Sequence, residues 1–343
     1  MPKTYSEAGV DIDEEGRAIH ELVSEIQKTA SFRKGKIGES LTKIGHFSGI
    51  VRLDDTKALA ISTDGVGSKV LIAEAMQKYD TIGIDLVAMN ANDIICVGAE
   101  PIALVDYIAM ERPDPEVTRE IGLGLAKGAE MAGIAIVGGE LASLPDTVRG
   151  LDLVGTIIGV VEIGKIISGE TIELGDTIIG LESSGIHSNG LTLARKVLLE
   201  AYDIEEKVFG DRSVGEELLE PTKIYVKEVL DILNKVEVKG LANITGGGLG
   251  NLARLAQYGF SLYDLPKPHK VFDVIQEVGE ISDEEMYRTF NMGIGFCVVV
   301  GEDGADKVIE ICEKHGTKGQ IIGRVAEGKG VRLEDMGFAF EYS

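Results

Sequence analysis

The chain has 343 residues and a formal net charge of −23, because 57 Asp and Glu residues outnumber 34 Lys and Arg residues. It contains 44 glycines among 343 residues, about twice the roughly 7% share of glycine in an average protein. Its 44% hydrophobic content excludes a disordered chain. The acidity argues against a protein that binds nucleic-acid backbones, which requires a basic surface. A local site for a phosphate ligand stays compatible with this charge.

Three scattered cysteines are too few for a disulfide framework or a zinc site, so we expect reduced core thiols. The longest apolar stretch, around residues 153–161, has about half of the ~20 residues that a membrane-spanning helix needs. No basic segment followed by an apolar one opens the chain. These observations predict a cytoplasmic protein with no membrane partner.

Helix-like and strand-like patterns alternate along the first half of the chain. In order, we expect a helix at 14–30, a basic loop at 31–38, a strand at 58–62, a turn at 64–69, a helix at 81–97, a strand at 102–108, a helix at 115–132, a strand at 135–137 and a strand at 151–161. We read Gly138-Gly139-Glu140 as a flexible turn after the short strand.

A turn-rich segment at 163–176 precedes a second, similar series. There we expect a strand at 177–181, a loop at 183–190, helices at 191–201 and 222–233, a loop at 245–250, a helix at 251–258, a strand at 296–300, a helix at 304–314 and a β-rich tail. The pattern predicts an α/β (α+β) protein with two domains, 1–168 and 169–343.

The first glycine cluster lies between a strand and a helix. Glycine permits positive φ and lets backbone N–H groups approach an anion beside a helix N-terminus. Asp64 precedes the glycines, and Ser68 and Lys69 follow them. A carboxylate for Mg²⁺ with backbone and lysine donors for phosphate oxygens would make a metal–phosphate site. A tight surface turn is the alternative.

Polar residues also interrupt the apolar helix at 81–97. Asp85, Asn92 and Asp93 project close to one face, and burying carboxylates is costly unless they are paired or hold a metal. A solvated helix edge is the other interpretation. With Asp64 and Glu140, Asp93 would supply one of three acids at the ends of separate elements, which fits Mg²⁺.

The second half holds two further loops rich in glycine and hydroxyl groups, 183–190 (SSGIHSNG) and 245–248 (TGGG). Both precede an expected helix and suit a second phosphate group. His187 is flanked by Ser188 and Asn189, which makes it a site candidate, although a structural histidine is the alternative. No Ser-His-Asp arrangement can be assigned from spacing.

Together these segments closely resemble the phosphoribosylformylglycinamidine cyclo-ligases, also called aminoimidazole ribonucleotide synthetases. The resemblance runs through seven ordered blocks, namely AGVDID (8–13), TDGVGSK (63–69), TIGIDLVAMNANDIICVGAEP (81–101), GGELASLP (138–145), SSGIHSNG (183–190), ITGGG (244–248) and EMYRTFNMGIGF (285–296).

The resemblance implies a homodimer in which the N-terminal sheets of two subunits form a β-barrel, with a larger α/β C-terminal domain. It also implies a step of de novo purine biosynthesis. ATP activates the amide oxygen of formylglycinamidine ribonucleotide, an amidine nitrogen attacks that carbon, and the ring closes to 5-aminoimidazole ribonucleotide. ADP and phosphate are released.

The resemblance also implies roles for particular residues. The ATP site would comprise Asp64, Gly65, Val66, Gly67, Ser68, Lys69, Gly138, Gly139 and Glu140. The metal ligands would be Asp64, Asp93 and Glu140. The nucleotide-sugar substrate would contact Ser184, Gly185, His187, Ser188, Asn189, Gly190, Asn243, Thr245, Gly246 and Gly247. Catalytic roles would fall to His187, Asp93 and Lys69, and the sequence does not decide whether His187 or Asp93 accepts the proton.

Three positions depart from the usual family pattern. Ser6 replaces a lysine, Leu141 a threonine and Asn243 a histidine. Asn can replace a histidine hydrogen bond but cannot act as a base. Two alternatives therefore accompany the ring-closure hypothesis: another ATP-dependent phosphoryl-transfer enzyme of the same superfamily, or an inactive ATP-binding scaffold.

Overall fold

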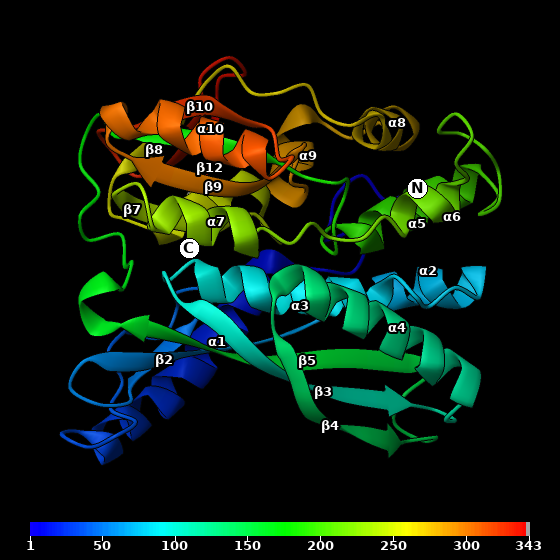
Figure 1. Cartoon of the computed structure of the whole chain (residues 1–343). Coiled ribbons are helices and arrows are strands. Elements are labelled where there is room, and N and C mark those ends of the chain that lie inside the picture. Colours follow the sequence, from blue (N-terminus) through cyan, green and yellow to red (C-terminus); the bar gives the residue numbers. More distant parts are fainter. Residues whose placement is uncertain (341–343) are drawn as a thin grey trace.

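The computed structural model describes residues 1–340 and contains two mixed β-sheets with a layer of helices between them (Figure 1). Residues 341–343, the end of the predicted second domain, lie outside the described residues. The first sheet has the order β1-β2-β5-β3-β4, in which only β3 and β4 pair in parallel. Its strands are β1 (Gly49–Arg52), β2 (Lys57–Gly65), β3 (Glu100–Met110), β4 (Ala135–Ser143) and β5 (Leu151–Glu162).

The second sheet has the order β12-β11-β8-β10-β6-β9-β7. Its strands are β6 (Thr177–Glu182), β7 (Val238–Asn243), β8 (Gly259–Leu262), β9 (Ile294–Val300), β10 (Gly319–Ala326), β11 (Gly330–Leu333) and β12 (Phe338–Phe340). Strands β6 and β9 are almost wholly buried, so they form the centre of the C-terminal core.

The helices connect and cover these sheets. The α-helices are α1 (Ile12–Ile26), α2 (Lys69–Met76), α3 (Ile82–Ile95), α4 (Pro115–Ala132), α5 (Leu191–Ala201), α6 (Val214–Leu218), α7 (Val226–Leu233), α8 (Lys270–Gly279), α9 (Asp283–Thr289) and α10 (Ala305–Lys314). Short 3₁₀ helices include η1 (Gln27–Arg33) and η3 (Gly248–Arg254).

Helix α3 lies at the centre of the molecule, between the first sheet and the C-terminal half (Figure 1). Nearly every residue of α3 is buried, as expected for a helix that is apolar on most sides. Helix α4 packs closely against it because glycines face each other. A Cβ atom on Gly83 would lie 2.3 Å from the backbone nitrogen of Leu125, so only glycine fits there.

The sequence predicts several elements correctly. Helix α4 begins at Pro115 after the N-cap Asp114 and ends at Ala132, with Gly133 as the C-cap at a φ of 71°. The two-domain α/β fold is confirmed, whereas the intersubunit barrel stays a prediction. The first sheet ends at Glu162 and the second begins at Thr177. The proposed boundary between 168 and 169 lies within this connection and also stays a prediction.

Four local predictions are wrong. The expected turn at 64–69 is shorter, because pairing with β5 extends β2 through Gly65 and α2 begins at Lys69. Strand β4 continues through Ser143, so Gly138-Gly139-Glu140 lies within a strand rather than in a flexible turn. The expected helix at 251–258 is the 3₁₀ helix η3. The expected helix at 222–233 begins only at Val226. In each case pairing or packing with distant segments overrides the local pattern.

Along residues 1–340, no helix combines the length and apolarity needed to cross a bilayer. The three cysteines are buried with free thiols, as predicted.

Candidate functional site

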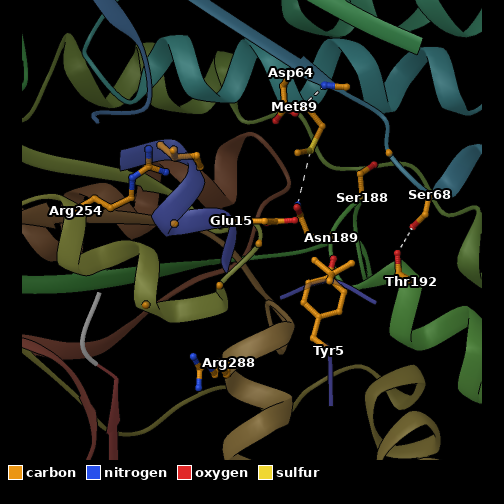
Figure 2. Close-up of a pocket in the computed structure, with 18 of the residues that line it drawn as sticks. Tyr5, Glu15, Asp64, Ser68, Met89, Ser188, Asn189, Thr192, Arg254 and Arg288 are labelled. Atoms are coloured by element: carbon orange, nitrogen blue, oxygen red, sulfur yellow. Dashed lines mark hydrogen bonds between the residues drawn. The ribbon is translucent and has the colours of Figure 1, made fainter. Parts of the chain in front are cut away.

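A cavity of about 760 Å³ lies between the two halves of the molecule (Figure 2). The first half contributes residues 64–68, which are the end of β2 and the turn that follows it and are called the glycine turn below, and Met89 of α3. The second half contributes the loop before α5, the η3 segment and helix α9. The N-terminal arm contributes Tyr5 and α1 contributes Glu15. Phe340, near the C-terminal end of the chain, also lines the cavity. The cavity is therefore built from segments distant in the sequence.

The glycine turn presents backbone to this cavity. The predicted residues on this wall are Asp64, Gly65, Val66, Gly67 and Ser68. Asn90 of α3 holds the turn by accepting from the Asp64 N–H at 3.1 Å and donating to the Asp64 carbonyl at 3.1 Å. Gly67 has a φ of 67°, which explains the glycine there. The Ser68 hydroxyl accepts from the Thr192 hydroxyl at 2.9 Å, which links the two halves.

The structure does not place Lys69 in the cavity. Its ammonium is fully buried and donates to Asp85 Oδ1 at 2.8 Å and to the Glu220 carbonyl at 2.5 Å. Burial lowers the pKa of Lys69, and the neighbouring Asp85 carboxylate opposes that effect. The predicted contact between Lys69 and phosphate would require this ion pair to break. We therefore leave Lys69 out of the proposed phosphate site.

Asp93, near the end of α3, is not among the residues that line the cavity, but Asp64 and Arg254, whose charges act on it, both are. Its Oδ1 accepts from Asn243 Nδ2 at 2.9 Å, and its Oδ2 accepts from the Ser62 hydroxyl at 3.4 Å. Burial raises the pKa of Asp93 to about 7, with the nearby Asp64 charge adding to the shift and the Asn243 hydrogen bond opposing it. Such a carboxyl can exchange a proton near neutral pH. The position where the family usually has histidine thus contributes an amide that orients this acid.

Glu140 lies apart from Asp64 and Asp93. In the register of the first sheet, Asp64 is opposite Gly155, Gly155 opposite Asp106, and Asp106 opposite Gly139. Glu140 is one residue farther along β4 and so projects from the other face of the sheet. It is exposed and three strands away from Asp64 in the sheet order. The prediction that one chain gathers all three acids around a metal is not supported by this geometry.

His187 is a buried structural residue in this conformation. Its Nε2 accepts from the backbone N–H of Ser184 at 3.1 Å, and the Lys223 N–H lies 3.5 Å away. Burial lowers the pKa of His187 to about 3, with the positive Lys69 nearby adding to the shift. An imidazole with this pKa and an occupied acceptor nitrogen is a poor proton acceptor at neutral pH. Of the two candidates left open by the sequence, the geometry favours Asp93.

The predicted substrate residues divide into two groups. Those that line the cavity are Ser188, Asn189, Gly246 and Gly247. Those that do not line it are Ser184, Gly185, His187, Gly190, Asn243 and Thr245. The Ser184 hydroxyl donates to the Pro221 carbonyl at 2.6 Å. A Cβ atom on Gly190 would lie 2.5 Å from the Phe290 ring, so this glycine permits close packing.

Sequence reasoning missed the two arginines of the cavity, Arg254 and Arg288, which Figure 2 shows on η3 and α9. The Arg254 guanidinium lies 4.3 Å from the centre of the Phe47 ring, and its Nη2 donates to the Gly45 and His46 carbonyls. Guanidinium groups suit phosphate recognition. A signal was present for Arg288, which lies in the block at 285–296, whereas Arg254 lies six residues beyond the block at 244–248.

The residues present fit a magnesium ion that arrives with a nucleotide rather than one in a protein cage. Within residues 1–340, no three His, Cys, Asp or Glu side chains come close enough to hold a metal together. Asp64 does border the cavity, and burial raises its pKa, so a cation would stabilise its charged form. Magnesium is commonly bound by one or two carboxylates together with substrate phosphates.

Comparison with known proteins agrees with this architecture. Residues 45–161 match the family described as AIR synthase related protein, N-terminal domain, and residues 173–336 match the corresponding C-terminal domain. A Thermococcus gammatolerans protein named phosphoribosylformylglycinamidine cyclo-ligase is 51% identical, covering 97% of this chain and 98% of its own. One of the same name from Pyrococcus furiosus is also 51% identical, covering 98% and 99%.

Among solved structures, T. maritima PurL complexed with ADP aligns with a TM-score of 0.57 at 18% identity, covering 85% of this chain and 44% of that one. At this identity the likeness concerns the fold alone. The close relatives cover nearly the whole chain, and both halves match the family in order. The chain therefore belongs to the phosphoribosylformylglycinamidine cyclo-ligase family.

Proposed function

We propose that this protein catalyses the ATP-dependent closure of formylglycinamidine ribonucleotide to 5-aminoimidazole ribonucleotide, releasing ADP and phosphate, in the de novo purine pathway of the cytoplasm. Family membership supports the reaction. The observation that carries the proposal at the level of residues is the shared cavity. It joins a glycine turn suited to a nucleotide with polar loops and arginines suited to a second anionic ligand.

In this proposal, ATP binds along the glycine turn at 64–68. Backbone N–H groups would contact its phosphates, and Asp64 would hold the accompanying Mg²⁺. The ion, when bound, supplies neutralisation of phosphate charge. The nucleotide-sugar binds across the cavity, against Ser188, Asn189 and the Gly246-Gly247 backbone. Arg254 and Arg288 provide positive charge for its phosphate group.

The reaction then needs mainly orientation and a proton acceptor. The amide oxygen attacks the terminal phosphorus of ATP and ADP leaves, which turns that oxygen into a good leaving group. The amidine nitrogen next forms a bond to the carbon that carries this oxygen. The carbon–oxygen bond breaks, phosphate departs, and the attacking nitrogen loses a proton. We assign the proton to Asp93, because a carboxyl with a pKa of about 7 can accept it at neutral pH. Holding both ligands in one cavity supplies the orientation.

We further propose that a second copy of the chain covers the open face of the first sheet. That face carries exposed apolar side chains on three strands, among them Ile61, Val105, Tyr107 and Val137. Apolar groups gathered on one sheet face indicate an interaction surface. The resemblance to a family with an intersubunit barrel suggests the occupant. Glu140 projects from this same face, so any role in a metal site would be exerted toward the partner subunit.

The deciding experiment measures ADP release by the purified protein with and without formylglycinamidine ribonucleotide, together with formation of the aminoimidazole product. We expect ADP release to depend on that substrate and to match product formation one to one. Binding of an ATP analogue without substrate-dependent ADP release would instead indicate an inactive scaffold. ADP release that is independent of this substrate would indicate a different phosphoryl acceptor.

A further inference from the structure

A single buried carboxylate connects the two halves of the molecule behind the cavity. Asp85 of α3 is fully buried, and its Oδ1 lies 2.8 Å from Lys69 Nζ. The same oxygen accepts from the Thr222 N–H at 2.7 Å, the Thr222 hydroxyl at 2.6 Å and the Ser188 hydroxyl at 3.1 Å. Lys69 belongs to the first half, whereas Thr222 and Ser188 belong to the second. Asp85 is thus a hub with donors from both.

Stability alone is a poor explanation of this hub. All four donors converge on Oδ1, whereas Oδ2 of Asp85 is buried with no hydrogen-bond partner among residues 1–340. A buried ion pair loses much of its attraction to desolvation, and apolar side chains of similar volume often stabilise a fold as well. An unsatisfied buried oxygen adds a further penalty. An arrangement that costs stability suggests a functional reason.

Two of the three residues that donate to Asp85, Lys69 and Ser188, adjoin or belong to the cavity walls. Lys69 directly follows Ser68, the last residue of the glycine turn that lines the cavity. Ser188 itself lines the opposite wall. A movement of Asp85 would therefore shift the turn proposed for ATP and the loop proposed for the nucleotide-sugar relative to each other.

We propose that Asp85 is a positioning residue that fixes the position of the glycine turn relative to the Ser188–Asn189 loop on the other side of the cavity. It acts through Lys69, Thr222 and Ser188 and touches neither ligand. The identity of the two ligands rests on the proposed function, but the coupling between the two walls does not. Lys69 is paired with Asp85, and this pairing explains why its ammonium does not reach the cavity surface.

Thr222→Val tests this role with a small perturbation outside the cavity lining. Valine keeps the volume and the backbone N–H but loses the hydroxyl bond to Asp85 and the 3.3 Å contact with the Ser188 hydroxyl. Thr317→Val is a matched control, because the buried Thr317 hydroxyl donates to Glu228 Oε1 at 2.8 Å, and neither residue lines the cavity. We expect Thr222→Val to lower kcat/KM at least tenfold and to accelerate amide hydrogen exchange in both 65–68 and 187–189. Thr317→Val should lose similar thermal stability with kcat/KM within twofold of wild type.

The double variant Asp85→Leu with Lys69→Met separates positioning from folding. It removes both charges but leaves the buried Thr222 N–H and hydroxyl without their acceptor, so we expect some loss of thermal stability. Assayed at a temperature where circular dichroism shows the variant folded, kcat/KM should still be at least tenfold lower. Wild-type kinetics in this variant would overturn the proposal, as would equal kinetic effects of Thr222→Val and Thr317→Val. Calorimetric affinity for a non-hydrolysable ATP analogue and hydrogen exchange need no turnover. They therefore test the coupling even if the wild-type protein proves inactive on the proposed substrate.

Discussion

Replacing Asp93 by asparagine should raise stability and abolish most activity. The new amide would keep the shape of the side chain and an oxygen to accept from Asn243, and the Ser62 hydroxyl can reverse its role from donor to acceptor. The substitution therefore removes the titrating proton with little change in packing. Its effects on stability and on catalysis have opposite signs, which makes the pair of measurements informative.

The size of the stability effect follows from the pKa. The folded protein raises the Asp93 pKa from 3.8 to about 7, a difference of about three pH units, and each unit corresponds to about 1.4 kcal/mol. Between pH 4 and 7 the folded state binds more protons at Asp93 than the unfolded state, so wild-type stability falls as pH rises through this window. The upper bound of this loss is ~4 kcal/mol, and local relaxation and water penetration reduce it to about 2 kcal/mol.

We therefore expect Asp93→Asn to exceed wild type in free energy of unfolding at pH 8 and to equal it near pH 4, as measured by denaturant titration. Turnover should fall about 100-fold or more, the usual contribution of a general base. Wild-type kcat should rise with pH to a plateau above about 7, and the variant should lack this step. Asp106→Asn is the control, because Asp106 is a half-buried carboxyl of β3 whose pKa burial also raises and which, like Asp93, does not line the cavity. Turnover within threefold of wild type would refute the assignment of Asp93 as proton acceptor.

Three other substitutions address the remaining assignments. Arg288→Ala should raise the KM for the nucleotide-sugar at least tenfold, because a charge-assisted contact is worth about 1.5–3 kcal/mol; an unchanged KM would remove Arg288 from the proposed phosphate site. His187→Ala should lower the free energy of unfolding by about 2 kcal/mol through the orphaned Ser184 N–H, while the pH profile of kcat stays as in wild type; a lost pH step would restore His187 as the base. Val105→Asp should convert a dimer into monomers in sedimentation, and a wild-type monomer would refute the proposed contact.

Local sequence signals located one wall of the site correctly. The sequence predicts glycines between a strand and a helix at 64–69. In the structure residues 64–68, the end of β2 and the turn before α2, line the cavity. A strand, glycines and a helix start are properties of neighbouring residues, so the sequence reports them directly. The same holds for Ser188 and Asn189 before α5, which line the opposite wall of the cavity.

Side-chain direction was harder to predict because it depends on distant partners. Lys69 follows the glycine turn, yet Asp85 and the Glu220 carbonyl draw its ammonium into the interior. Glu140 changes sheet face because β4 extends without interruption, and a shift of one residue reverses the face. His187 is satisfied by a backbone N–H that no spacing rule specifies. Residue type and position were insufficient in all three cases.

The balance of charge around the cavity connects these findings. The chain carries a net charge of −23, which repels anionic ligands at long range, although salt screens this repulsion beyond about 8–10 Å. Within the cavity Arg254 and Arg288 supply positive charge, and Lys69 is neutralised by Asp85 outside it. Asp64 adds a negative group beside the proposed phosphates, which is unfavourable unless a cation intervenes. A nucleotide carrying Mg²⁺ resolves that conflict, so the acidity of the site argues for binding of the metal complex rather than of free ATP.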